Sequence, residues 1–104
     1  MDREGYPTPD ELQNIREWDV LEKGPMGLVE YVRERWCNGS IVVTGKKVLY
    51  VQLHTCGWSG NEQIMRALID NRFFWMFYWQ QSKRGGHYWF KIDTRENNYI
   101  RRKS

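Results

Sequence analysis

An Asn-Gly pair at positions 38 and 39 divides the chain into two parts with different hydrophobic patterns. Before the pair, apolar residues recur at spacings of three and four, which is typical of amphipathic helices. After it, β-branched and aromatic residues form short runs between turn residues, which is typical of strands. This segregation predicts an α+β fold. Because 104 residues are close to the usual size of one domain, we expect a single domain with a helical part over 1–37, a sheet with one helix over 38–93 and a basic tail over 94–104.

Two helices are predicted in the first part. Thr8-Pro9-Asp10-Glu11 places a capping threonine before a proline and completes a Thr-x-x-Glu capping box, so a short helix should run to about Trp18. Gly24-Pro25 then interrupts the chain. A second helix is expected over 26–36, because apolar side chains recur on one face at Leu28, Val29, Val32 and Trp36.

Four strands and one helix are predicted in the second part. A hairpin is expected from strands over 41–44 and 48–53. Ser59-x-x-Glu62 forms a second capping box and predicts a helix after it. The continuously apolar run Phe73–Trp79 predicts a central strand covered on both faces, and His87–Ile92 predicts a last strand. The expected order is ααββαββ, with a sheet of about four mainly antiparallel strands and helices packed mainly on one side.

Composition and charge narrow the protein's class. No run approaches the roughly 18 apolar residues of a membrane span, and Met1–Glu4 is unlike a signal peptide, so we expect a cytoplasmic protein without membrane contact. Cys37 and Cys56 lack a CxxC spacing and are expected as free thiols. Residues 1–40 carry nine acidic and five basic side chains, whereas residues 41–104 carry four acidic and eleven basic ones. The basic half could attract an anionic partner or form a solvated cationic face.

Gly57–Glu62 is the first candidate binding loop. A helix that begins after a glycine loop offers free amide groups and a positive dipole end to an anion. Trp58 could stack on a base or sugar, and Ser59, Gly60 and Asn61 could approach phosphate or ribose closely. Helix capping by Ser59 explains the same residues without a ligand.

Lys83–Tyr88 is the second candidate loop. Two cations, two glycines and an imidazole lie together at a hairpin tip, and this chemistry suits phosphate or carboxylate recognition. Arg84 would pair with phosphate near Gly85, and His87 or Tyr88 would donate or accept a hydrogen bond. A tight turn kept soluble by its cations explains the segment equally well.

Catalytic and metal-binding alternatives depend on the two histidines. His54 ends one predicted strand and His87 begins another, so the two imidazoles could act as general acid and general base on a phosphodiester. Cys37 and Cys56 could join them around zinc, but no tight ligand spacing is present. We therefore predict no metal and no other cofactor.

Several segments resemble small uncharacterised proteins encoded by phages and prophages. The resemblance covers most of the chain and is strongest at Gly57-Trp58-Ser59-Gly60-Asn61-Glu62 and Arg84-Gly85-Gly86-His87-Tyr88. It implies a glycine at the position of Cys56. It also implies a setting in which small accessory proteins act as counter-defence factors, by blocking a host immune protein or sequestering its nucleotide signal.

The leading hypothesis is a non-enzymatic protein that binds a phosphate-bearing nucleotide between the two loops, and a homo-oligomer could complete the pocket. The first alternative is an inhibitor that presents exposed aromatic residues and the acidic N-terminal helices to a host defence protein. The second is a phosphodiesterase or nuclease that requires His54 and His87. Binding to nucleic acid is a further alternative, which the basic half and Arg101-Arg102-Lys103 favour.

Overall fold

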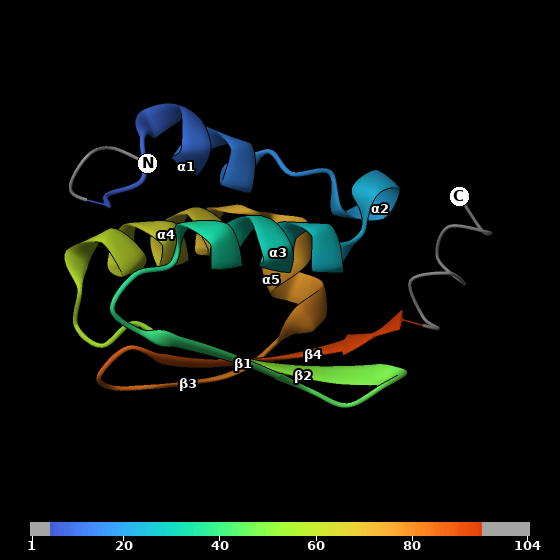
Figure 1. Ribbon diagram of the computed structural model, residues 1–104. Coiled ribbons are helices and arrows are strands. Elements are labelled where there is room, and N and C mark those ends of the chain that lie inside the picture. Colours follow the sequence, from blue (N-terminus) through green and yellow to red (C-terminus); the bar gives the residue numbers. More distant parts are fainter. Residues whose placement is uncertain (1–4, 95–104) are drawn as a thin grey trace.

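The computed structural model describes residues 5–94 and confirms an α+β fold in which helices pack on one face of a four-stranded antiparallel sheet (Figure 1). The sheet forms one layer, α3, α4 and α5 lie above it, and α1 lies farther out over α3 and α4. In chain order the elements are α1 Pro9–Arg16, α2 Val20–Lys23, α3 Pro25–Arg35, β1 Ser40–Thr44, β2 Val48–His54, α4 Ser59–Asp70, α5 Arg72–Tyr78, β3 Trp79–Lys83 and β4 His87–Asp93.

The predicted capping box at the start of α1 is confirmed. Thr8 Oγ1 accepts a hydrogen bond from the Glu11 amide, and the Glu11 carboxylate accepts one from the Thr8 amide. The carboxylate also forms an ion pair with Arg35 at 2.5 Å, which joins α1 to the end of α3. Helix α1 ends at Arg16 rather than near Trp18, and a separate short helix, α2, follows with Asp19 as its cap.

The four strands have the order β1-β2-β4-β3, and every neighbouring pair is antiparallel. The predicted hairpin of β1 and β2 is present, and a second hairpin joins β3 to β4. Strands β2 and β4 are the two central ones and pair over seven residues each. The two strands that carry the histidines therefore lie side by side, although 33 residues separate His54 from His87.

The prediction of a strand over Phe73–Trp79 is wrong, because most of this run forms helix α5. Asn71 begins the helix by accepting a hydrogen bond from the Phe74 amide. The Asn71 amide group also donates to the carbonyls of Ile15 and Trp18, so the start of α5 is tied to the end of α1. These long-range hydrogen bonds stabilise a helical turn that the uniformly apolar sequence does not indicate.

The predicted Ser59-x-x-Glu62 capping box is also wrong. Trp58 occupies the cap position of α4 and provides no side-chain hydrogen bond to the helix. Ser59 Oγ instead lies 3.0 Å from the Tyr6 hydroxyl, and Glu62 accepts a hydrogen bond from Thr55 Oγ1. Both side chains therefore connect α4 to other segments rather than closing its first turn.

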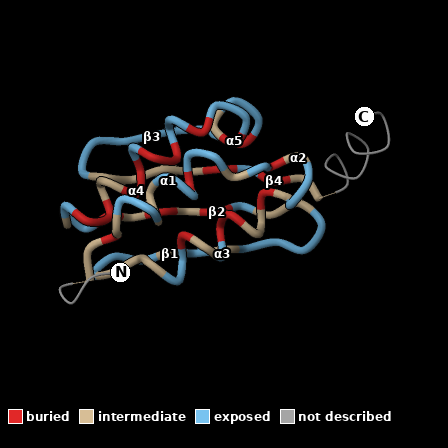
Figure 2. The backbone as a smooth tube through the Cα atoms, turned by 90° about the horizontal axis from the view of Figure 1, so that it is seen from above, coloured by how far each residue is buried: buried red, intermediate tan, exposed pale blue. Residues whose placement is uncertain are grey.

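The hydrophobic core lies between the sheet and the helices α3, α4 and α5. Figure 2 colours the backbone by burial, and its red, buried segments lie along α3, α4 and the middle of β2. Phe74 and Phe90 are the largest, with ring centroids 5.3 Å apart.

No helix of the described residues is long and apolar enough to cross a membrane. Residues 95–104, including the predicted basic tail, lie outside the described part of the chain.

Candidate functional site

The sheet has one face covered by helices and one open face. Along β2, Val51 and Leu53 are buried against the helices, and Tyr50, Gln52 and His54 lie on the opposite side because strand side chains alternate. The pairing register extends this open face across the sheet. The open face comprises Ser40, Val42 and Thr44 of β1, Tyr50, Gln52 and His54 of β2, His87, Trp89 and Lys91 of β4, and Gln81 and Lys83 of β3.

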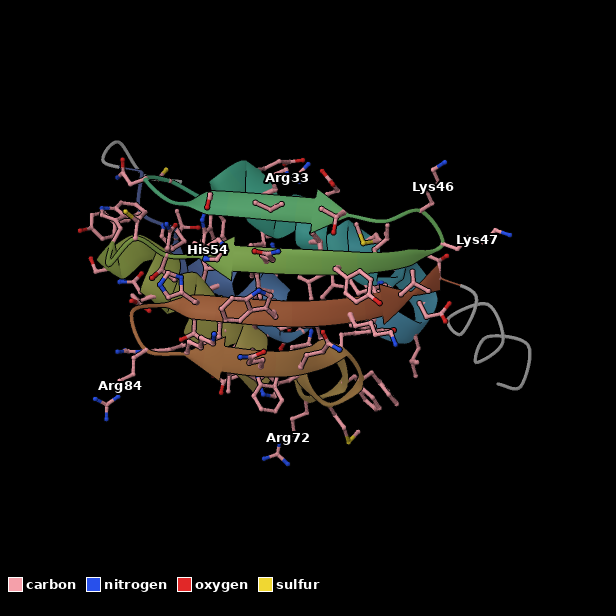
Figure 3. All side chains as sticks on the ribbon, turned by 90° about the horizontal axis from the view of Figure 1, so that it is seen from below. Arg33, Lys46, Lys47, His54, Arg72 and Arg84 are labelled. Atoms are coloured by element: carbon pink, nitrogen blue, oxygen red, sulfur yellow. The ribbon has the colours of Figure 1, made fainter. Side chains whose placement is uncertain are left out.

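The open-face side chains form successive rows across the sheet. The first row places His54 opposite His87 and His87 opposite Lys83. The second row joins Gln52, Trp89 and Gln81, and the third joins Tyr50 to Lys91. Figure 3 looks onto this face: His54 and Arg84 lie toward one end, and Lys46 and Lys47 lie at the other.

The two histidines contact each other directly. Their Nδ1 atoms are 2.8 Å apart and their ring centroids are 5.0 Å apart, so the two nitrogens face each other. Such a contact needs one nitrogen to donate and the other to accept, so at least one ring is neutral. His54 Nε2 lies 3.2 Å from the side-chain oxygen of Gln52 and donates to it. When His54 is neutral, its Nδ1 is then the acceptor, and His87 Nδ1 is the donor.

The hydrogen bonds that link Gln52, His54 and His87 determine what the Nε2 atom of His87 can do. With His54 as acceptor, the Nδ1–H of His87 is engaged in either protonation state of His87. Nε2 makes no hydrogen bond to another residue within 5–94 and lies beside Gly85 at the hairpin tip. His87 can therefore carry a positive charge without breaking the contact, and its Nε2–H can then donate to an anion.

The two predicted loops meet beside the histidines. The Thr55 amide donates to the Gly86 carbonyl at 2.9 Å, which ties the β2–α4 loop to the β3–β4 turn. Gly86 has a φ of 80°, and a Cβ at this position would collide with Thr55 Oγ1. Thr55 is fully buried and also donates to Glu62. The junction thus needs glycine at 86, and sequence reasoning missed Thr55 as the residue that holds it.

The structure places the predicted residues of the first loop in supporting positions. The Trp58 ring packs on Tyr6, with centroids 4.8 Å apart, and covers Gly60 so closely that a Cβ there would collide with it. Asn61 is 0% exposed; its amide group donates to the carbonyls of Cys37 and Thr55 and accepts from the Cys37 amide. The Asn61 side chain therefore holds the loop and has no group free for a ligand. This revises its predicted role.

The residues of the hairpin tip are divided between the two faces of the sheet. Arg84 and Gly85 are exposed at the tip, and His87 lies on the open face. Tyr88 points the other way, toward the helices, where its ring contacts Trp75. Burial raises the pKa of the Tyr88 hydroxyl, and the nearby Glu62 carboxylate raises it further. Tyr88 therefore stays neutral and lies away from the side on which His87 could meet a ligand.

The positions of the histidines and cysteines can be compared with what a metal site and a hydrolytic site would need. Cys37 and Cys56 are free thiols, and no group of three or more candidate metal ligands occurs among residues 5–94. The facing Nδ1 atoms leave no room between them for a phosphate, whereas a shared acid–base mechanism needs the two rings on different sides of the reacting phosphorus. The pair is better placed to orient one imidazole than to act as two catalysts.

Cys56 adopts the left-handed backbone conformation, with a φ of 55°. Glycine adopts this conformation without strain, whereas a side chain disfavours it. The glycine that the resemblance implies at position 56 would fit this backbone.

Sequence reasoning missed the middle of the open face. Trp89 lies in the second row, with its ring centroid 6.0 Å from that of His54 and 5.5 Å from the Lys83 ammonium. Tyr50 is 44% exposed. The alternation of polar and apolar residues in β2 and β4 could have identified both, because it separates Gln52 and His54 from the buried positions.

Comparisons of the chain with protein-family models, with curated proteins and with solved structures find no match.

Proposed function

We propose that the protein is a non-enzymatic binding protein that holds a phosphate-bearing nucleotide on the open face, at the end where His54 and His87 meet. The observation that carries this proposal is the Nδ1 contact of 2.8 Å, which leaves His87 Nε2 directed to the hairpin tip. Lys83 lies opposite His87 in the sheet, and Arg84 follows it at the exposed tip. Three groups that can bear positive charge thus lie at the same end of the open face.

Each group has a role that follows from its chemistry. Lys83 and Arg84 attract the phosphate, and the guanidinium can bind two of its oxygens. His87 Nε2 donates a third hydrogen bond when the ring is charged. Trp89 lies in the next row, where its half-buried ring offers a surface for the base. Trp89 thereby takes the stacking role that sequence analysis assigned to Trp58, whose ring packs on Tyr6.

The same proposal includes a role for the protein in a host, where it would remove a nucleotide signal. A small protein that retains a nucleotide without converting it would remove that nucleotide from solution, as the phage resemblance implies for an immune signal. The coupled histidines support retention over turnover, because one imidazole orients the other.

The first experiment is a thermal-shift screen against mono-, di- and cyclic nucleotides, with chromatography of each mixture afterwards. A ligand at a hundred times its Kd stabilises the folded protein by about 2.7 kcal/mol, which for a domain of this size raises Tm by roughly 10 °C or more. We expect such a shift and recovery of intact ligand. Breakdown of the ligand would instead favour the histidine-dependent phosphodiesterase.

The matched variants are His87→Ala, Lys83→Ala and Arg84→Ala for the site, with Arg33→Ala as a control. Arg33 is an exposed cation of α3, on the covered side of the sheet (Figure 3). The site variants should lose the ligand-induced shift, and the control should keep it. Equal shifts in all four proteins would contradict the proposed position of the site.

A second candidate function is binding of a protein partner through α5. The apolar stripe of Phe73, Met76 and Phe77 on α5 is exposed, with Met76 at 68% and Phe73 at 52%, and Ile69 near the end of α4 is also exposed. Phe73 and Phe77 stack on each other at 6.1 Å, so the stripe presents adjacent rings to solvent. Aromatic and methionine side chains are enriched at protein interfaces. Replacement of Phe73 and Met76 by serine should abolish capture of such a partner without changing nucleotide-induced stabilisation.

A further inference from the structure

The open face continues well beyond the histidine end. Rows two residues apart along a strand are separated by about 6.8 Å, so the rows of His87, Trp89 and Lys91 extend over about 13.6 Å, which is farther than one base can cover. The third row pairs Tyr50 with Lys91, and both side chains are exposed. A ligand that used all three rows would be an oligomer.

Positively charged side chains are also placed along the rows of the open face. Lys83 and Lys91 lie on the open face, and Asp93, in the last position of β4, is the one acid in the four strands. The exposed turn between β1 and β2 adds Lys46 and Lys47 at the far end of the sheet (Figure 3). Cations therefore flank both ends of a surface whose middle is aromatic and amide-bearing.

We propose that the open face binds single-stranded nucleic acid, with about three to four nucleotides along the rows of His87, Trp89 and Tyr50. This proposal rests on the proposed nucleotide site, which becomes the first position of a longer track. Trp89 and Tyr50 stack on successive bases, while Gln52 and Gln81, in the row of Trp89, hydrogen-bond to base edges. Lys83, Lys91 and the cations at the two ends contact phosphates.

The arrangement selects a single strand over a duplex. Stacking on protein rings needs bases that are not already paired and stacked within a helix. The rings of Trp89 and Tyr50 lie on a sheet surface that no helix of residues 5–94 covers. Paired bases cannot reach them, so a duplex would contact the flanking cations alone.

The test measures fluorescence anisotropy of labelled oligo(U) and oligo(dT) of two to eight nucleotides, with uridine triphosphate as the mononucleotide probe. We expect affinity to rise by about tenfold or more from the mononucleotide to four nucleotides, because a second base finds a ring, and then to level off. Tyr50→Ala should weaken the longer strands about tenfold and leave the mononucleotide unaffected. Phe73→Ala, which removes an exposed ring of α5, is the matched control and should change neither.

Salt dependence provides a second readout. Lys91→Ala should reduce the slope of log affinity against log salt by about 0.7, the contribution of one phosphate contact to a single strand. Equal affinity for all lengths, or no effect of Tyr50→Ala on the longer strands, would overturn the track. If uridine triphosphate still bound and His87→Ala still abolished that binding, the nucleotide site would stand without the track. If long strands bound in a way that needed Tyr50 but not His87, the track would stand without the nucleotide site.

Discussion

The two faces of the sheet carry similar numbers of large side chains but differ in what those side chains contact. Phe90 points into the core, where its ring meets Phe74 and Trp75 at 5.3 and 5.5 Å. Its neighbour Trp89 points to the open face and meets two histidines and a lysine. The covered face therefore stabilises the fold, while the open face presents aromatic, amide and cationic groups to a ligand. Substitutions on the two faces should separate stability from binding.

The largest contrast is expected between Phe90→Ala and Trp89→Ala, which change adjacent positions of one strand. Phe90 is 1% exposed, so its loss should lower the free energy of unfolding by about 3–5 kcal/mol through lost burial and a cavity. Trp89→Ala should cost about 1 kcal/mol but abolish most nucleotide binding. Urea unfolding followed by far-UV circular dichroism, together with the ligand-induced Tm shift, measures both. Similar losses of stability would mean that the open face also belongs to the core.

The next largest effect is expected at Asn61, which belongs to the covered side although it lies in a predicted binding loop. Asn61→Ala would leave the part-buried Cys37 amide and the carbonyls of Cys37 and Thr55 without this partner, at a cost of about 3 kcal/mol. Ser59→Ala is the control, because it removes one exposed hydrogen bond to Tyr6. It should cost a few tenths of a kcal/mol. If Asn61→Ala kept its stability and lost ligand binding, Asn61 would be a ligand residue after all.

A smaller effect comes from an ion pair within the helical layers. Burial by itself would raise the pKa of Glu11, but hydrogen bonds from the Thr8 amide and the Arg35 guanidinium, together with nearby positive charge, lower it to about 2 from 4.5. The unfolded chain therefore binds a proton that the folded chain does not. The resulting stabilisation is fully present above about pH 4.5 and is lost as pH falls toward about 2.

The pH dependence of urea unfolding measures this contribution. Glu11→Gln should remove about 2 kcal/mol at neutral pH and flatten the loss of stability between pH 4.5 and 2. Glu34→Gln is the control, because Glu34 contacts the same arginine from a side chain that is mostly exposed. Its profile should match that of the unchanged protein. An unaltered acid profile in Glu11→Gln would mean that the ion pair contributes nothing to stability.

The smallest effect is expected at Cys56, in the loop that supports the histidine end of the open face. Its φ of 55° strains a residue with a side chain, so Cys56→Gly should raise the free energy of unfolding by about 0.5–1 kcal/mol, after allowance for the freedom of glycine in the unfolded chain. Tm measurement with and without nucleotide checks this. Ligand affinity should stay the same, because the exposed thiol is not one of the proposed contacts. A loss of stability would show that the side chain is needed there.

Much of the fold could be read from local patterns. The Thr8 capping box and the spacing of Leu28 and Val32 predicted two helices correctly, since each signal depends on residues within one or two turns. The strand prediction for Phe73–Trp79 failed for the opposite reason. Every residue in that run is apolar, so it has no periodicity, and the start of the helix depends on hydrogen bonds from Asn71 to carbonyls more than 50 residues away.

The candidate site shows the same division between local and distant causes. Local sequence patterns were enough to place the glycine loops, the cations and the two histidines at the ends of predicted elements, because turn chemistry and strand alternation are local. Only the tertiary structure decided that β2 and β4 pair with His54 opposite His87, that Asn61 is buried and that Trp89 and Tyr50 share one open face. Strand order and register depend on how the whole core packs, and no short stretch of sequence contains that information.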